Sequence, residues 1–406
     1  MSWEFVRADQ FCESVRDGTH DTPKEVECGY KLVTSKHIRD GQVYPDEAYS
    51  ISEKDYKKIN ERSKVEQWDV VMSMIGNGLG RTAVIKDNPL YAIKNLALFK
   101  IGNEAKAKWL HYYLSSEEGQ GLIYNSLQGS GQPFISLNLL RAFPIPNPPY
   151  EIITKITGYL EKYDNLIENN QKQIKLLEEA AQRLYKEWFV DLRFPGYENT
   201  PIIDGVPQGW RKAAFSDVFT FVRGKSYTSK ELSDDSGVLM VNLKNIRAYG
   251  GYKRNAEKRF TGAYKEEQLL VGGDVVMGVT DMTQERRLVG YVALIPSFNE
   301  KTTFSMDLIK LIPLSASKNY LYCALQYGGY SEQIAPLANG VNVLHLKPEA
   351  MMKMEMLVPD KNTMQTFDVQ FEAVRLKIEA LEKQCDLAAQ ARDRLLPKLM
   401  SGELEV

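Results

Sequence analysis

The sequence is poor in the residues that build metal and disulfide frameworks. Only four cysteines and four histidines occur in 406 residues, and both types are scattered, without a CxxC pair. Structural zinc sites and disulfide frames need such residues in closely spaced groups. We therefore expect a fold that neither a metal nor a disulfide holds together, and no cofactor.

Long apolar runs are also missing. No stretch approaches the roughly 20 apolar residues that a membrane-spanning helix needs. The first residues, Met1–Phe5, lack the basic and apolar regions of a signal peptide. We therefore expect no membrane association and a cytoplasmic protein. With 43% hydrophobic and 10% aromatic residues, the chain has enough apolar material for more than one core.

An excess of positive charge is absent as well. The chain has 51 Lys and Arg against 53 Asp and Glu, a formal net charge of -2. This balance argues against non-specific coating of nucleic acid, because such binding comes mainly from phosphate neutralisation. A local basic face is compatible with it, since six basic residues lie between 244 and 259 against the single acid Glu257. Such a run is also typical of a solvated loop, so charge alone assigns no function.

What the chain does have is an internal duplication. The sequence VTSKHIR at 33–39 returns as VNLKNIR at 241–247, and DVVM at 69–72 returns at 274–277. Both halves carry short apolar runs between Gly and Asn turns, which predict strands, and one short amphipathic helix each. A chain built from two copies of one unit resembles a dimer, and it suits a two-part target or two copies of one partner.

Each half closes with a long heptad pattern, from about 150 to 189 and from about 363 to 400. Apolar residues alternate in steps of three and four, which predicts two coiled-coil seams that pack on each other. Pro397 is expected to break the hydrogen-bond ladder near the end of the second helix. At ~1.5 Å per residue, about 40 helical residues would hold two domains about 60 Å apart. The seam residues expected to form the spacer and partner helices are Leu160, Ile167, Ile174, Leu177, Leu184, Trp188, Phe371, Ile378, Leu381, Leu395 and Leu399.

Two fragments favour another class of protein, a free-standing DNA N6-adenine methyltransferase. Gly76 and Gly78 lie in a glycine loop after an expected strand, and Asn147–Tyr150 reads NPPY, the motif that holds an extruded adenine. The chain between the two fragments is too short for a cofactor-binding sheet, and the second copy has neither motif at the matching place. A third alternative is a coiled-coil scaffold that binds only protein.

The motifs together resemble one family along essentially the whole chain, the specificity (S) subunits of type I restriction-modification systems. Arg16–Pro23 is similar to the opening segment of the family, Asp69–Ile85 to its GDIL block and Gln132–Ile135 to its QxxI turn. The ends of the two long helices, at 184–189 and 395–404, are similar to its central and distal conserved regions. The second half departs from this pattern where GVN replaces the Gln-Pro turn.

The resemblance implies an α+β protein with two pseudo-symmetric α/β globular target recognition domains, separated by a pair of long antiparallel coiled-coil helices. The implied boundaries are 1–148 and 197–362 for the recognition domains, and 149–196 and 363–406 for the central and distal helices. The protein would be non-catalytic, with each recognition domain reading one half of a bipartite double-stranded DNA site. Its helices would dock two methylation (M) subunits and, through them, restriction (R) subunits.

Candidate DNA-contacting residues are basic or amide side chains on the expected loops. Such side chains can read base edges, while contacts to phosphates fix the register on the duplex. Solvent exposure without any contact to DNA is the alternative for each of them, and for His37 a second alternative is a strand cap. The candidates are Lys36, His37, Arg39, Asn77, Arg81, Gln132, Lys244, Asn245, Arg247, Lys253, Arg254, Arg286, Arg287 and Asn342.

Overall fold

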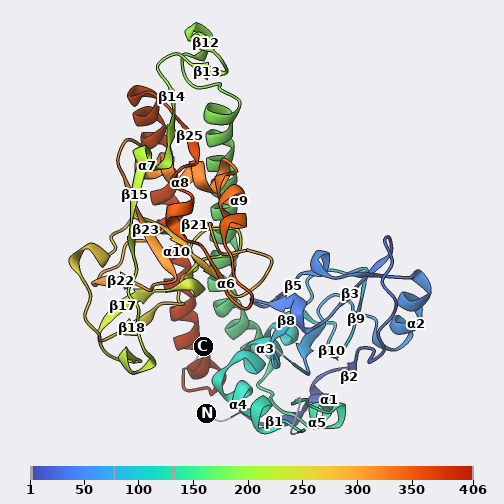
Figure 1. Cartoon of the computed structure of the whole chain (residues 1–406). Helices are drawn as coiled ribbons and strands as arrows, with labels where there is room; N and C mark the ends of the chain where they lie inside the picture. Colours follow the sequence, from blue (N-terminus) through green and yellow to red (C-terminus); the bar gives the residue numbers. More distant parts are fainter. Residues whose placement is uncertain (1–2, 77, 130–132, 405–406) are drawn as a thin grey trace. The chain divides into compact units, whose positions relative to one another are not determined.

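Tertiary contacts divide the chain into two units, and the division cuts both long helices. The structure is a computed structural model that describes residues 3–76, 78–129 and 133–404. Unit 1 comprises Met1–Asn170 and Gln384–Val406, and unit 2 comprises Gln171–Lys383. Each long helix therefore supplies one part to each unit (Figure 1).

Unit 1 is built on a four-stranded antiparallel sheet with the strand order β2-β10-β7-β8. Successive side chains of a strand point to opposite faces of the sheet. Val70 and Met72 therefore join the core beneath α3, while Val71 joins a second core on the other face. Both faces are covered, which is why these strands read as continuous apolar runs. The strands are β2 (Ser14–Asp17), β7 (Val70–Ser73), β8 (Thr82–Val84) and β10 (Leu96–Lys100), and the covering helix is α3 (Glu104–Ser115).

A second, three-stranded sheet of unit 1 has the order β6-β3-β9, with β3 and β9 parallel. A short antiparallel pair, β1 with β11, brings the start of the chain to the start of the first long helix. The further strands are β1 (Phe5–Arg7), β3 (Tyr30–Val33), β4 (Ile38–Arg39), β5 (Gln42–Val43), β6 (Ser50–Ile51), β9 (Tyr91–Ile93) and β11 (Pro144–Pro146). The further helices are α1 (Ala8–Phe11), α2 (Glu53–Ser63), α4 (Glu117–Asn125) and α5 (Leu137–Arg141).

Unit 2 repeats this topology, with a four-stranded antiparallel sheet in the order β15-β23-β19-β21. Its second sheet has the order β16-β18-β17-β22, with β17 and β22 parallel, and β14 pairs with β25. The strands are β12 (Ile202–Ile203), β13 (Val206–Pro207), β14 (Arg211–Ala214), β15 (Phe219–Arg223), β16 (Leu232–Ser233), β17 (Val238–Val241), β18 (Lys258–Phe260), β19 (Val275–Gly278), β20 (Thr280–Asp281), β21 (Val292–Leu294), β22 (Thr302–Phe304), β23 (Leu308–Pro313), β24 (Leu344–His345) and β25 (Glu355–Val358). The helices are α7 (Phe215–Val218), α8 (Lys318–Tyr327) and α9 (Tyr330–Ile334).

The duplicated DVVM segment begins the same buried strand in both units. In unit 1 the backbone N–H of Glu66 donates to Asp69 Oδ2 at 2.7 Å, and in unit 2 that of Val271 donates to Asp274 Oδ2 at 2.9 Å. The aspartate thus fastens the turn that leads into β7 or β19. The predicted duplication is confirmed in the order of the strands and in this local detail.

The two predicted long helices are present as α6 (Tyr150–Tyr185), which continues into a π-helical turn at Lys186–Val190, and α10 (Lys361–Met400). α10 continues three residues past Pro397, so the proline removes one N–H donor without ending the helix. No described helix is apolar over a stretch long enough to cross a membrane. Every predicted seam residue is buried or half-buried, as expected if the two helices pack on each other along the seam.

Within unit 1 the helices run antiparallel. Arg392 Nη1 lies 2.6 Å from Asp164 Oδ1, and Asn170 Nδ2 donates to Gln384 Oε1 at 3.2 Å. The residue numbers of α10 therefore fall as those of α6 rise. Asn170 is the polar member of the first seam, and this bond satisfies its amide where two apolar seams meet.

Candidate nucleic-acid interface

The duplicated VTSKHIR and VNLKNIR segments form the same single 3-10 turn in both units. The backbone N–H of Thr34 donates to His37 Nδ1 at 2.9 Å, and that of Asn242 donates to Asn245 Oδ1 at 3.0 Å. His37 is 9% exposed and Asn245 is fully buried. Burial lowers the pKa of the His37 imidazole, which favours the neutral ring that accepts this bond. The two side chains stabilise the turn, so we leave them out of the proposed DNA-contacting set.

The residue just before each capping side chain is an exposed lysine, Lys36 in unit 1 and Lys244 in unit 2. Arg39, two residues after His37, stacks on the ring of Tyr44 with 3.8 Å between its Cζ and the ring centroid. It also pairs with Glu47 through both terminal nitrogens, with Nη1 2.7 Å from Oε2. This charge-assisted hydrogen bond raises the pKa of Arg39. The turn thus presents an exposed lysine and an arginine that Tyr44 and Glu47 hold in place.

A tight glycine loop joins β7 to β8 in unit 1 and presents Arg81. Gly76, Gly78 and Gly80 have φ values of 78°, 93° and 80°. These left-handed conformations cost glycine little, since it has no Cβ. Arg81 is exposed, and within the described ranges its side chain makes no ion pair. Asn77, the candidate inside this loop, lies outside the described residues.

A second segment of unit 1 lies beside this glycine loop. Ile75 and Phe134 form an antiparallel bridge, and the N–H of Ile135 donates to the carbonyl of Met74 at 3.1 Å. Phe134 is 40% exposed. The bridge brings Phe134 beside the loop that carries Arg81. The predicted Gln132 lies outside the described residues.

Unit 2 brings together the two matching segments. β20 pairs with β24, and Gln284 Nε2 donates to the carbonyl of Val341 at 2.8 Å, so the loop of Arg286 and Arg287 lies beside that of Asn342. Asp281 fastens the first loop by accepting from two backbone N–H groups, at 2.8 and 2.7 Å. Burial acts to raise the pKa of Asp281, but these donors hold it below its usual value.

The fold of unit 2 thus brings together DNA-contacting candidates from three segments that are distant in sequence. The N–H of Tyr249 donates to the carbonyl of Arg287 at 2.7 Å, which ties the VNLKNIR turn to the arginine loop. Arg287 is exposed and pairs with Glu285. Arg286 has a φ of 53°, and its Nε is buried without a hydrogen-bond partner in the described part of the chain. Asn342 is exposed at the tip of the neighbouring loop.

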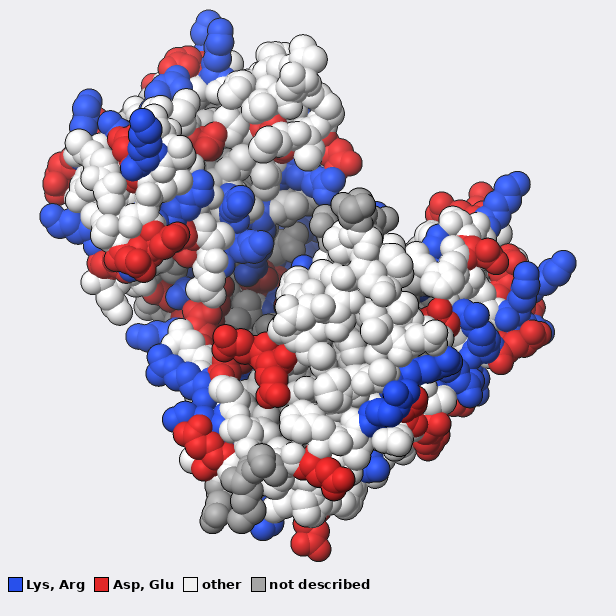
Figure 2. Space-filling model, turned by 90° about the horizontal axis from the view of Figure 1, so that it is seen from below, with Lys and Arg blue, Asp and Glu red and all other residues white. Residues whose placement is uncertain are grey.

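The basic run between 244 and 259 divides into two exposed lysines and four paired side chains. Lys244 and Lys253 are exposed, while the other four basic residues have partners inside unit 2. Figure 2 shows Lys and Arg interleaved with Asp and Glu on the face it displays. The partners are Glu178 and Glu382 for Arg247, Glu382 for Arg254, Tyr227 for Lys258 and Glu300 for Arg259.

The methyltransferase motifs have structural roles in this fold. Gly76 and Gly78 lie between antiparallel strands, whereas a nucleotide cofactor binds beyond the carboxyl ends of parallel strands. Asn147 donates its backbone N–H to the carbonyl of Glu4 at 2.8 Å. Tyr150 is the first residue of α6, and its hydroxyl accepts from Asn103 Nδ2 at 3.2 Å.

Two exposed leucines on the long helices were not predicted from the sequence. Leu176 on α6 is 64% exposed, and Leu387 on α10 is 55% exposed. Both lie outside the seam, and they are related by the same offset of 211 residues as the seam positions. The duplication could have revealed these two leucines, because a solvent-facing leucine recurs at the same offset as the buried seam residues.

The chain thus consists of two copies of one sheet-and-helix unit, each with basic loops and each joined to long helices. Residues 1–179 match the family model of the type I restriction modification DNA specificity domain. The chain is 24% identical to the type I restriction enzyme MjaIX specificity subunit of Methanocaldococcus jannaschii, over 81% of this chain and 76% of that protein. The MjaVIII specificity subunit of the same organism is 20% identical, over 100% of this chain and 93% of that protein.

The crystal structure of an S subunit from M. genitalium shares the fold. It aligns with a TM-score of 0.59 and 14% sequence identity, over 98% of this chain and 96% of that one. The chain is thus similar along nearly its whole length to specificity (S) subunits of type I restriction-modification systems. The methyltransferase alternative gains no support from these relatives.

Proposed function

We propose that each unit reads one half of a bipartite double-stranded DNA site, and that the long helices dock two M subunits and, through them, R subunits. The chain itself carries out no catalysis in this scheme and serves only recognition. The functional division is the one expected from the sequence, with recognition domains at 1–148 and 197–362. The relatives support assembly into a restriction-modification complex, since they are named as specificity subunits of type I restriction enzymes.

The observation that carries the proposal is the equivalent placement of arginine loops in the two units. In each unit a loop after the central strand presents arginine next to a second loop held by backbone pairing. Arginine is the residue most suited to bidentate reading of guanine in the major groove. The proposed contacts are Lys36, Arg39, Arg81, Lys244, Lys253, Arg286, Arg287 and Asn342, with Asn77 and Gln132 retained from the sequence alone.

Selection from randomised DNA by the complex with M subunits is expected to return two half-sites separated by a constant gap. Arg81→Ala should relax the half-site read by unit 1 only, and Arg287→Ala the half-site read by unit 2 only. Each change should cost about 1–3 kcal/mol in binding to the preferred bases. Enriched sequences from the wild type and both variants are compared position by position.

Arg211→Ala is the matched control for these variants. Arg211 is an exposed arginine on β14, which pairs with β25, and it bonds to Ser315 Oγ at 3.0 Å. We expect it to leave both half-sites unchanged. A contiguous motif, or no motif, from the wild-type complex would refute the bipartite proposal.

We infer that the M subunits contact the outer leucines rather than the buried seam. The seam residues are occupied between the two helices, whereas Leu176 and Leu387 face solvent at equivalent places. Leu176→Glu and Leu387→Glu should each weaken association with one M subunit by at least tenfold, because burying a leucine contributes roughly 1.5–3 kcal/mol. Sedimentation of M with each variant measures this. Leu314→Glu, at a leucine 59% exposed outside both helices, is the control that should bind M normally.

A further inference from the structure

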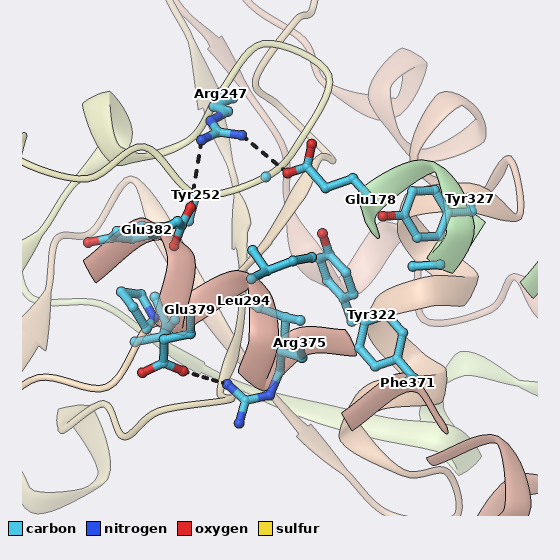
Figure 3. A pocket seen from close by; sticks show the side chains of 15 residues that line it. Glu178, Arg247, Tyr252, Leu294, Tyr322, Tyr327, Phe371, Arg375, Glu379 and Glu382 are labelled. Atoms are coloured by element: carbon cyan, nitrogen blue, oxygen red, sulfur yellow. Dashed lines mark hydrogen bonds and ion pairs between the residues drawn. The ribbon is translucent and has the colours of Figure 1, made fainter. Parts of the chain in front are cut away.

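Four charged residues link the 243–254 segment of unit 2 to the long helices. Arg247 Nη1 lies 3.4 Å from Glu178 Oε1 on α6, and its Nη2 lies 3.9 Å from Glu382 Oε1 on α10. Arg254 Nη1 lies 3.4 Å from Glu382 Oε2. Figure 3 shows Arg247 directed toward both glutamates. One guanidinium therefore touches both long helices, and Glu382 receives two guanidinium groups.

Burial makes the pair of Arg254 and Glu382 the stronger part of this cluster. The side chains of Arg254 and Glu382 are 23% and 18% exposed, whereas those of Arg247 and Glu178 are 45% and 43% exposed. An exposed ion pair contributes little, but a buried carboxylate that loses its partner is strongly destabilised. Burial acts to raise the pKa of Glu382, which makes the nearby cations essential to its charged form.

The backbone between the two arginines is held rigidly. Arg247 donates its N–H to the carbonyl of Gly251 at 2.9 Å, and Lys253 donates to the carbonyl of Asn245 at 2.7 Å. Between them Tyr252 is 8% exposed, and it lines a pocket with Tyr322 of α8. Arg247 and Arg254 therefore anchor the whole 243–254 segment, while Lys244 and Lys253 of that segment remain exposed.

Unit 1 uses the matching arginine differently. Arg39 corresponds to Arg247 at an offset of 208 residues. Its partner is Glu47, which lies eight residues further along the chain in unit 1. The two equivalent positions are thus both basic, but among the described residues only Arg247 pairs with glutamates on the long helices. The helix anchor is a property of the second recognition unit.

We infer that Arg254 and Glu382, assisted by Arg247 and Glu178, are positioning residues that fix the 243–254 segment of unit 2 on its helices and so set the gap between half-sites that the protein accepts. The two arginines then hold protein instead of phosphate. This inference rests on the proposed bipartite recognition. Within the 243–254 segment, Lys253 then contacts a DNA phosphate, and its neighbour Arg254 sets the gap between the half-sites.

The adjacent residues Lys253 and Arg254 give a matched test in the full complex with M subunits. We measure affinity for the selected site and for sites with a gap one base pair longer or shorter, each over a range of salt concentrations. Arg254→Ala should reduce the preference for the correct gap by roughly fivefold or more, with an unchanged salt dependence. Lys253→Ala should reduce the slope of log affinity against log salt by about one and leave the gap preference intact.

Glu382→Gln is the second variant, because it keeps the shape of the side chain and removes only its charge. It should relax the gap preference as Arg254→Ala does, without a change in salt slope. The inference is overturned if Arg254→Ala lowers the salt slope while the gap preference stays, or if both Arg254→Ala and Glu382→Gln leave the preference at its wild-type value. A wild-type complex without any gap preference would instead refute the proposed function.

Discussion

Removing one heptad from each long helix is expected to shorten the gap between the half-sites by about three base pairs. Seven helical residues span about 10.5 Å at ~1.5 Å each, and duplex DNA rises about 3.4 Å per base pair. Residues 169–175 of α6 and 388–394 of α10 are suitable, because their removal spares the outer leucines as well as Glu178 and Glu382. Seven residues are one full repeat of the seam, so the helices can pack as before.

Site selection with the shortened complex measures this change, and the two half-sites themselves should stay the same. Insertion of one heptad in each helix should lengthen the gap by the same amount, which keeps the test informative if the shorter protein fails to assemble. Deletion of four residues from each helix is the control, because it takes the seam out of register and should abolish assembly. An unchanged gap in both heptad variants would show that the helices are not the spacer.

Phe367→Ala is expected to lower the free energy of unfolding of unit 2 by about 3–5 kcal/mol. Phe367 is fully buried near the start of α10, and its ring centroid lies 4.9 Å from that of Phe189 and 5.9 Å from that of Trp188. The aromatic cluster joins the end of α6 to the start of α10, so a cavity there separates the two helices as well as removing apolar contact. Urea denaturation followed by tryptophan fluorescence measures the loss.

Val369→Ala is the control for this prediction. Val369 lies two residues further along α10 and is 74% exposed, so its truncation should change the free energy by no more than about 0.5 kcal/mol. A loss below about 1 kcal/mol for Phe367→Ala would mean that the cluster repacks around the missing ring, and that it does not hold the helices together.

The sequence alone determined the features that depend on neighbouring residues. Alternating steps of three and four are a local pattern, so α6 and α10 could be predicted to within a few residues of their bounds. The duplication could likewise be found by comparing the chain with itself. It showed that VTSKHIR and VNLKNIR match, but not that His37 and Asn245 match because each closes a turn by accepting a backbone N–H.

Only the tertiary structure decided which basic residues are free to meet a partner. Lys253 and Arg254 are adjacent and equally basic in the sequence, yet one is exposed and the other pairs with Glu382, which lies 128 residues further along the chain. In the same way, β20 and β24 bring Arg287 beside the loop of Asn342. A charge is engaged or free according to what the fold places against it, and no local pattern carries that information. The sequence therefore determined that the chain has two similar units on long helices, and the tertiary structure decided which side chains of unit 2 face outward and which hold it to those helices.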